Sequence, residues 1–272
     1  MGDVSTVFVK KYEAEVQAEF QQQTSLMQST VRSKPIMNAE AVKFPWMGKV
    51  IAGTKARGGL IPTMDADHKS IELTGTEYYA ASYVEENDLD RLNFDERREY
   101  VKMGAYALGR KTDEVIIDAM KNGQSTDSGN ASNPLTMAVL SGLIAKMNKA
   151  DVPDDGQRYC VVGPDQWEQL MGIDQFVKAD YVGPEYPLLK NVENRRFRGI
   201  NFFVSNLLPA GTGTSTICFL YHRLGVGAAV GKRVTAQIDR IPEKDSYLVN
   251  NKIRIGAAVV DKTGVIKFSV KD

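Results

Sequence analysis

Two histidines are the first candidates for chemistry, because imidazole serves as an acid, a base or a metal ligand. His68 lies beside Asp67 and Lys69 in a predicted loop, and His222 follows an apolar run next to Arg223. Neither has a second histidine or a cysteine at the spacing of a metal site, and HExxH and CxxC motifs are absent. We therefore expect a solvated or structural role for each histidine, and no metal site.

The remaining patterns for nucleophiles and cofactors are incomplete. Cys160 and Cys218 lie in apolar runs, where a thiol is usually inert, and no GxSxG motif occurs. The glycine-rich stretch at 211–216 lacks the GKS or GKT ending of a phosphate loop. The stretch at 225–231 lacks the acidic residue and preceding strand of a dinucleotide site. We interpret these stretches as a surface turn and as tight packing, and expect no catalytic residue, no cofactor and no enzyme activity.

One local basic cluster consists of Arg195, Arg196 and Arg198, close to Lys190 and Phe197. Such a cluster suits an anionic partner, including a phosphate backbone. A solvated loop or a salt bridge to another subunit is the simpler explanation, because 34 basic residues balance 34 acidic ones in the chain.

Length and composition exclude several classes of protein. A chain of 272 residues can form a large core in one domain or two, and 43% apolar with 25% charged residues is ordinary for a soluble protein. No apolar stretch approaches the roughly 18 residues that span a bilayer, and the first residues do not resemble a secretion signal. A pI near 6.8 indicates no basic field for nucleic acid. We expect a soluble intracellular protein without a membrane partner.

The element around which the chain is organised is a predicted helix over residues 93–123. Asn93 is a suitable N-cap, Glu96 completes a capping box, and Gly123 is a natural stop. Such a helix is about 40 Å long at 1.5 Å per residue. Small residues from Gly104 to Gly109 favour a sheet packed closely along it. The predicted apolar face consists of Val101, Ala105, Leu108, Thr112, Val115 and Ala119.

Residues 42–83 are predicted to form a long two-stranded hairpin with a turn region near 58–67. Its first arm is basic, and acidic residues prevail from Asp65 onward. The arms could neutralise each other within the hairpin. Alternatively, the hairpin could reach across a neighbouring subunit, where opposite charges set the register. Its length favours this second interpretation, in which the intersubunit contacts are Lys43, Lys49, Lys55, Arg57, Asp65 and Asp67.

The N-terminal segment 6–31 is glutamine-rich and amphipathic, with Phe8 and Tyr12 in its apolar row. It could be an ordinary surface helix. It could also dock on a neighbouring subunit, because a terminal segment with aromatic anchors needs a surface to pack on. Phe8 and Tyr12 therefore join the predicted intersubunit contacts, together with Arg195, Arg196 and Arg198.

After a loop at 124–133 the pattern becomes compact α/β. Helices are predicted from Pro134 and from Pro164 to Gly172, and strands at 159–162, 200–204 and 217–221. The tail returns to strands at 234–238, 253–259 and 265–270, for which the long helix is the expected partner layer. The first and last parts of the chain would then form one domain, with residues 132–227 inserted into it.

In the order of its parts the chain resembles the major capsid proteins of tailed bacteriophages, which have the Hong Kong 97-like capsid fold shared with encapsulins. The resemblance covers nearly the whole chain. It is carried by the arm FVKKYEAEVQAEFQQQTSLMQSTVR, the two-stranded loop, the helix NFDERREYVKMGAYALGRKTDEVIIDAM, the pattern RYCVVGPDQWEQLM followed by RGINFFVSNLLP, and the ending GAAVVDKTGVIKFSV.

The resemblance implies an α+β fold with a spine helix packed on an antiparallel sheet, an inserted α/β axial domain, an extended loop and an N-terminal arm. It implies an arm at 1–41, an extended loop at 42–83, a peripheral domain at 84–131 and 228–272, and an axial domain at 132–227. It also implies a subunit that self-assembles, as hexamers and pentamers, into an icosahedral shell. That shell would enclose double-stranded DNA without sequence-specific binding.

The partners implied besides further copies are scaffolding, portal and decoration proteins, and the implied location is the virion, assembled in the host cytoplasm. No long extension resembles a built-in scaffold, so we expect any scaffold to be separate or previously removed. Within the same fold the alternative is an encapsulin-type shell that stores a cargo protein, although the long glutamine-rich arm favours the phage. From other classes, the alternatives are a small enzyme formed by 132–227 or a nucleic-acid-binding module that uses the arginine cluster.

Overall fold

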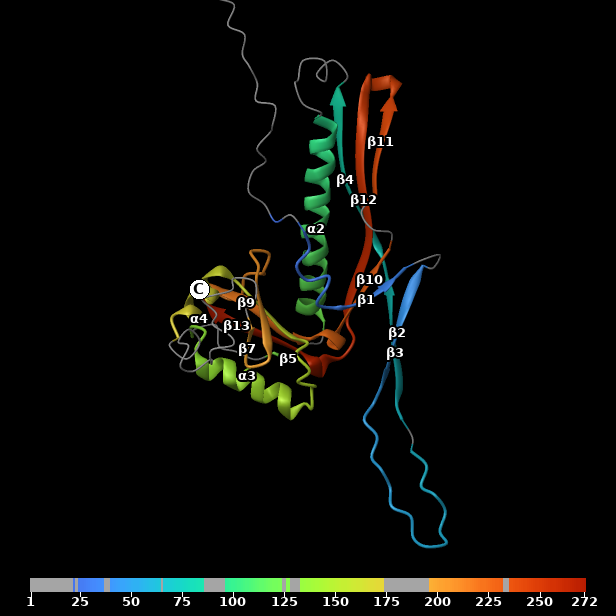
Figure 1. The fold of residues 1–272 in the computed structure, drawn as a ribbon, viewed down its shortest axis with the longest axis vertical. Helices are drawn as coiled ribbons and strands as arrows, with labels where there is room; N and C mark the ends of the chain where they lie inside the picture. The colour runs from blue at the N-terminus through green and yellow to red at the C-terminus, as the bar shows by residue number, and fades with distance from the viewer. Residues whose placement is uncertain are drawn as a thin grey trace, which may run out of the picture. The chain divides into compact units, whose positions relative to one another are not determined.

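The computed structural model describes residues 22, 24–36, 40–64, 66–85, 96–123, 126–127, 133–173, 196–231 and 235–272. The described residues belong to two compact units (Figure 1). The first unit takes in Glu77–Arg110 and Arg233–Ile253, and the second takes in Ser25–Thr76, Lys111–Lys232 and Arg254–Asp272. Each unit combines strands with part of one long helix, so the predicted α+β class is confirmed.

The second unit is built on a mixed six-stranded sheet with the order β5-β13-β9-β6-β8-β7. In chain order the strands are β5 (Thr126–Asp127), β6 (Arg158–Val162), β7 (Arg196–Phe197), β8 (Ile200–Val204), β9 (Ser215–His222) and β13 (Val265–Lys271). β6 pairs parallel with β8 and antiparallel with β9, and β9 pairs antiparallel with β13. The strands predicted at 159–162, 200–204 and 217–221 are confirmed.

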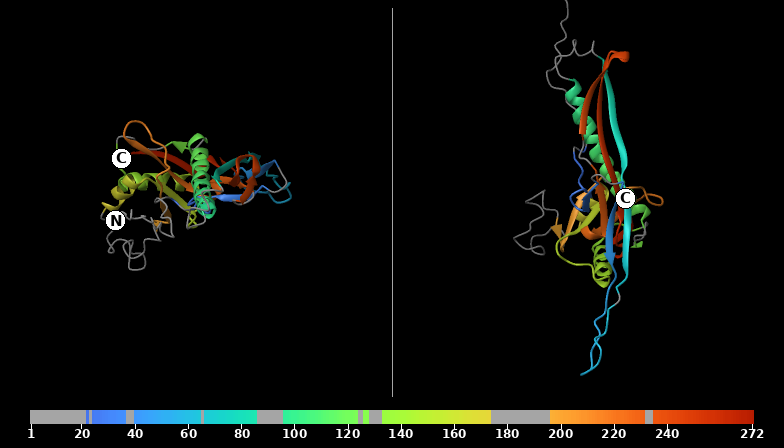
Figure 2. Two further views of the ribbon diagram at one scale, coloured as in Figure 1. Left: turned by 90° about the horizontal axis from the view of Figure 1, so that it is seen from above. Right: turned by 90° about the vertical axis from the view of Figure 1, so that its right-hand side faces the viewer.

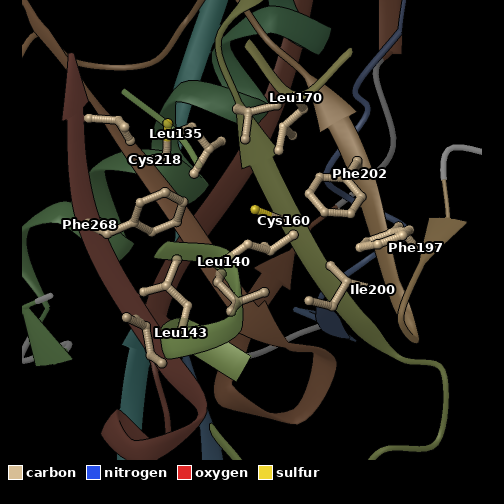
Figure 3. Close-up of a cluster of buried hydrophobic side chains, with 14 of the residues drawn as sticks. Leu135, Leu140, Leu143, Cys160, Leu170, Phe197, Ile200, Phe202, Cys218 and Phe268 are labelled. Carbon is tan, nitrogen blue, oxygen red and sulfur yellow. The ribbon is translucent and has the colours of Figure 1, made fainter. Parts of the chain in front are cut away.

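Both faces of the central strands are buried. On one face lie α3 (Met137–Lys149) and α4 (Pro164–Met171). Figure 3 shows the resulting core, in which the labelled side chains of Leu140, Leu143 and Leu170 converge with Cys160, Phe202, Cys218 and Phe268. On the opposite face, Val161, Phe219 and Tyr221 contact the long helix. Successive residues of a strand point to opposite faces, so strands covered on both sides must be apolar throughout.

The ends of the two helices in this unit are set by glycines in α4 and by a threonine cap in α3. α4 starts after Gly163 and stops at Gly172, as predicted. α3 begins only after its N-cap Thr136, whose hydroxyl accepts a hydrogen bond from the Val139 backbone N–H at 3.5 Å. The predicted start at Pro134 was therefore wrong, because the threonine supplies the cap.

The long helix is α2 (Glu96–Asn122), with 27 residues. Its predicted N-cap, Asn93, lies outside the described residues. Leu108 and Thr112 are buried as predicted. Further along, the buried residues are Ile116, Ile117 and Met120, whereas Val115 and Ala119 are half-buried. The predicted face was wrong in this part, because the larger side chains fill the space against the six-stranded sheet.

Also in the second unit, β1 (Arg32–Pro35) pairs with β10 (Val226–Val230), which pairs antiparallel with the end of β12 (Ser246–Val259). β10 was not predicted, since its glycines and alanines were interpreted only as tight packing. All five of its residues are buried. A Cβ atom on Gly227 would lie 2.9 Å from Val260 Cγ2, so the small residues are what allow this strand to be covered.

The last strand has a different partner from the predicted one. Residues 265–270 were expected to share one closing sheet with residues 234–238 and 253–259, with the long helix as the partner layer. β13 instead pairs with β9 in the six-stranded sheet, with Val265 opposite Tyr221. Ile266 and Phe268 fill the core under α3 and α4. The apolar row Ile266, Phe268 and Val270 is fully buried in this position, which explains the choice of partner. On the other face of β13 Val265 is buried against the long helix, whereas Lys267 and Ser269 are half-buried.

In the first unit, β11 (Thr235–Ile241) and β4 (Thr76–Glu85) both pair with β12, and Figure 2 shows the three strands side by side. The first half of α2 packs close to this sheet. A Cβ atom on Gly104 would overlap the amide of Asn251, a buried residue of β12. The predicted reason for the small residues in the helix, close approach of a sheet, is confirmed at Gly104.

The predicted hairpin consists of β2 (Ala41–Met47) and β3 (His68–Thr74), which pair antiparallel with Met47 opposite His68. The predicted second arm is two strands, because β4 leaves the hairpin at Gly75 and pairs with β12. Side chains of Ile36 and Arg254 lie where a Cβ atom of Gly75 would be, so glycine is required at this break. Phe44 and Leu73 anchor the base of the hairpin in a small apolar core with Ala229 and Val260.

The segment that leads into β1 is attached to α2 by a buried carboxylate. Asp113, 1% exposed, accepts hydrogen bonds from the Ser25 hydroxyl, from the Leu26 N–H at 3.0 Å and from the Met27 N–H at 3.1 Å. Described residues 24–31 form a bend and turn rather than the predicted helix. The aspartate satisfies backbone groups that a helix would have satisfied internally.

We expect the substitution Asp113→Ala to lower the free energy of unfolding by about 3 kcal/mol, because it leaves the buried Met27 N–H and the part-buried Leu26 N–H without an acceptor. Denaturant titration followed by circular dichroism measures the effect. Asp118→Ala, at an exposed position of the same helix, is the matched control and should change little. Equal effects of the two substitutions would contradict the proposed attachment.

Candidate functional site

Among the described residues, the side chains that could bind a metal ion do not cluster. No group of three histidine, cysteine, aspartate or glutamate side chains lies within reach of one ion in the part of the chain that the structure describes. None of the described helices has the length and apolar character needed to cross a membrane.

The two thiols lie deep in the core of the second unit. Burial raises the pKa of Cys160 well above its usual range and raises that of Cys218 to about 12. A thiol with so high a pKa holds almost no thiolate near neutral pH and is a poor nucleophile. The structure thus gives the physical reason for the expected inertness of both cysteines.

The predicted basic residues of the hairpin have different surroundings. Lys43 Nζ lies 3.8 Å from Glu72 across the two strands, which is the neutralisation expected within a hairpin. Lys49 forms an ion pair with Asp151 of the second unit, and both side chains are more than 70% exposed. Lys55 and Arg57 are exposed in the tip. Lys43 and Lys49 thus have partners within their own chain, and the predicted contact of these residues with another subunit remains a prediction.

The predicted acidic residues of the hairpin flank the second arm. Asp67 is exposed, and its Oδ2 atom lies 3.9 Å from Lys69 Nζ. Asp65 lies outside the described residues. The predicted contacts Phe8, Tyr12 and Arg195 also lie outside them.

The other two arginines of the basic cluster mark the turn between β7 and β8. Arg196 is exposed and covers Gly156. Arg198, also exposed, has a φ of 47° and donates a hydrogen bond to the Ser141 hydroxyl at 3.1 Å. Both arginines therefore have local structural contacts, and their predicted contact with another subunit remains a prediction.

The apolar tip of the hairpin was not predicted from the sequence. Residues 48–64 join β2 to β3 without strand pairing of their own. The large apolar side chains exposed there are Val50 (46%), Ile51 (90%), Leu60 (96%), Ile61 (75%) and Met64 (64%). The pair Leu60-Ile61 could have indicated this tip from the sequence. It lies between glycines and a proline in a predicted turn, where apolar side chains have no local core to enter. Clustered exposed apolar side chains mark an interaction surface.

A thiol reagent should not label native Cys160 or Cys218 near neutral pH, because both sulfurs are buried and protonated. Labelling should instead proceed at the rate of global unfolding and be complete in denaturant. Mass spectrometry of the quenched reaction identifies the modified residue. Rapid labelling of either cysteine in the folded protein would show that the core opens locally.

The substitution Lys49→Gln should leave the denaturant midpoint unchanged, because an ion pair exposed on both sides contributes little to stability. Any effect of this variant on assembly would then report a contact between copies. A lowered midpoint would show instead that Lys49 holds the base of the hairpin within its own chain.

The chain is similar in sequence and in fold to phage capsid proteins. A family model described as phage capsid protein matches residues 4–271. A search of the curated proteins finds no match. Similar solved structures include that of Mycobacterium phage Che8, with 19% identity, a TM-score of 0.76 and 98% of each chain covered.

Two further structures of similar fold come from other phages. One is the capsid of the Cyanophage P-SCSP1u, with 16% identity, a TM-score of 0.76, and coverage of 98% of this chain and 94% of that chain. The other is the head structure of Helicobacter pylori bacteriophage KHP40, with 10% identity, a TM-score of 0.76, and coverage of 96% and 94%. The predicted Hong Kong 97-like fold, with its long helix packed on a sheet, is confirmed.

The family match decides between the alternatives that the sequence left open. It covers the segment 132–227 together with the rest of the chain, so this segment is part of a capsid protein and not a separate small enzyme. The protein is a structural component of the virion, without enzymatic function, and the matched family is that of phage capsids, not of storage compartments. This chain belongs to the phage capsid protein family and is a subunit of a phage head shell.

Proposed function

We propose that the subunit assembles as hexamers and pentamers of an icosahedral shell that encloses double-stranded DNA, and that the tip of the β2–β3 hairpin is a principal contact between copies. The proposed contact at the hairpin tip is based on the exposed apolar side chains of residues 50–64. A monomer would leave them in water, whereas a neighbouring copy could bury them.

The energetic scale supports a contact of this kind. Fully burying an aliphatic side chain contributes about 1.5–3 kcal/mol, and Ile51, Leu60 and Ile61 are each at least 75% exposed. A shell repeats every contact by symmetry, so a few side chains per subunit are sufficient. The residues from Gly48 to Met64 include Lys49, Lys55 and Arg57 but no acidic residue, so an acidic surface on the neighbour would fit beside the apolar contact.

The proposal extends to the other parts of the chain and to other partners. We assign the arm to 1–41, the extended loop to 42–83, the axial domain to 132–227, and the peripheral domain to 84–131 and 228–272, except that β13 joins the sheet of the axial segment. Scaffolding, portal and decoration proteins are the expected partners besides further copies, and assembly takes place in the host cytoplasm. A formal net charge of zero is consistent with enclosing DNA without sequence-specific binding.

The test of the hairpin contact is the triple substitution Ile51→Ser, Leu60→Ser and Ile61→Ser. Wild-type protein, expressed alone or with its scaffold, should form shells, capsomers or curved sheets in electron micrographs. The variant should raise the concentration needed for assembly at least about tenfold, because it removes apolar burial at each contact. Its thermal midpoint should match the wild type, since the altered side chains are exposed.

Lys55→Gln with Arg57→Gln is the companion variant for the charges of the tip. It should weaken assembly mainly at low salt, because interactions between exposed charges are screened as the ionic strength rises. Unchanged assembly of the triple serine variant would contradict the role of the tip while leaving membership of the capsid family intact.

A further inference from the structure

Two neighbouring strands of the second unit leave one sheet and enter another at the same level. β9 ends at His222, passes through the 3-10 turn Arg223–Gly225 and becomes β10. β12 ends at Val259, passes through the 3-10 turn Lys262–Gly264 and becomes β13. Because β9 pairs with β13 and β10 pairs with β12, the two turns form a double crossover between the sheets.

The turns are held tightly against each other. The Gly225 carbonyl accepts hydrogen bonds from the N–H groups of Val260 at 2.8 Å and Asp261 at 3.2 Å. A Cβ atom on Gly225 would lie 3.1 Å from the carbonyl oxygen of Gly264. Movement of either turn must therefore involve the other.

Each turn is capped by a side chain that accepts a hydrogen bond from the N–H group two residues ahead. Asp261 Oδ1 accepts from the Thr263 N–H at 2.9 Å. His222 Nδ1 accepts from the Leu224 N–H at 3.2 Å. The two caps are equivalent in position but differ in chemistry, because a carboxylate has several lone pairs and a ring nitrogen has one.

The hydrogen bonds of His222 define its neutral form. Since Nδ1 accepts a backbone N–H, the ring proton must lie on Nε2, which is 3.0 Å from Asp155 Oδ1. The residue is 2% exposed, yet it lines a hollow of about 450 Å³ with Gly225, Asp261 and Gly264. Solvent in this hollow gives a proton a route to the ring.

We propose that His222 is a proton-operated cap of the crossover. When the ring is neutral, Nδ1 holds the turn Arg223–Gly225. A second proton would place an N–H on Nδ1 facing the Leu224 N–H, so this hydrogen bond is lost while the bond to Asp155 becomes charge-assisted. Acidification thus releases the β9–β10 turn and leaves the Asp261 cap of the β12–β13 turn in place.

The charged groups around the ring are compatible with this change. They are Asp155 and Asp151 of the loop after α3, Lys49 at the start of the segment 48–64, Arg158 opposite His222 on β6, Asp261 on the other turn, and Arg223 next in the chain. Burial raises the pKa of Asp155, but hydrogen bonds from His222 and the Gln157 N–H outweigh it, so the net pKa is below the usual value. Its carboxylate therefore stays charged in the range where imidazole takes up a proton. Asp151 is ion-paired with Lys49, and the Arg158 guanidinium donates to the carbonyl oxygens of Pro153 and Val152.

The test is amide hydrogen exchange of Leu224 in the unassembled full-length subunit, corrected for the intrinsic effect of pH. Protection of Leu224 should fall roughly tenfold between about pH 7.5 and about pH 5, the scale of one lost hydrogen bond. The Thr263 amide, capped by a carboxylate, is the internal control and should keep its protection. Unchanged protection of Leu224, or equal loss at both amides, would overturn the proposal.

Two substitutions at the same position separate the cap from the titration. The asparagine side chain of the His222→Asn variant can accept the hydrogen bond from the Leu224 N–H but cannot be protonated in this pH range. The protection of the Leu224 amide should therefore stay high at both pH values. The glutamine side chain of the His222→Gln variant can reach Asp155 but places no acceptor at the position of Nδ1. The protection of the Leu224 amide should therefore be low at both pH values. Acid-dependent protection in His222→Asn would assign the effect to another group.

The only other histidine in the sequence supplies the matched control. His68→Asn alters an exposed residue of β3 and should retain the wild-type response. Loss of the response in this variant would also overturn the assignment to His222. Because every measurement is made on the subunit alone, its outcome is independent of whether the proposed shell contacts are correct.

Discussion

The structure depends on the burial of β6 and β9 on both faces. α3 and α4 cover one face and the second half of α2 covers the other, so consecutive side chains such as Cys160 and Val161 enter different cores. Such strands cannot carry polar side chains in their middle without a large desolvation cost. Polar residues are consequently found at the strand ends. Arg158, 1% exposed, opens β6 and donates to the carbonyl oxygens of Val152 and Pro153, and His222 closes β9 beside Asp155.

The same constraint fills both faces of the central strands with apolar side chains that are covered within the subunit. The hairpin is the opposite case, since only its base, at Phe44 and Leu73, is anchored in an apolar core. Its tip exposes apolar side chains that a soluble monomer would ordinarily cover. The proposed contact with a neighbouring copy would supply the missing cover.

Much of the fold could be predicted because its signals are local. The three-and-four spacing of α2, the glycines that bound α4 and the apolar runs of β6, β8 and β9 each lie within one short window of sequence. The buried strand β10 was not predicted, because its glycines and alanines give no clear apolar pattern. The buried face of α2 was predicted wrongly near Ile116 and Ala119, because spacing alone does not show which of two faces has the larger side chains. The candidate contacts were chosen by charge. The structure instead shows that the large apolar side chains of Ile51, Leu60 and Ile61 are exposed and have no core to enter.

The sequence by itself determined the class of the protein: its helical and strand periods, its lack of catalytic and metal motifs, and the order of parts that resembles tailed-phage capsid proteins. Only the tertiary structure decided which strands pair, that β13 joins β9, that β4 leaves the hairpin for β12, and that His222 and Asp261 cap adjacent turns. The physical reason is that period and composition are properties of neighbouring residues. Pairing and capping depend on residues brought together from distant parts of the chain, and packing selects among partners that look equivalent in sequence.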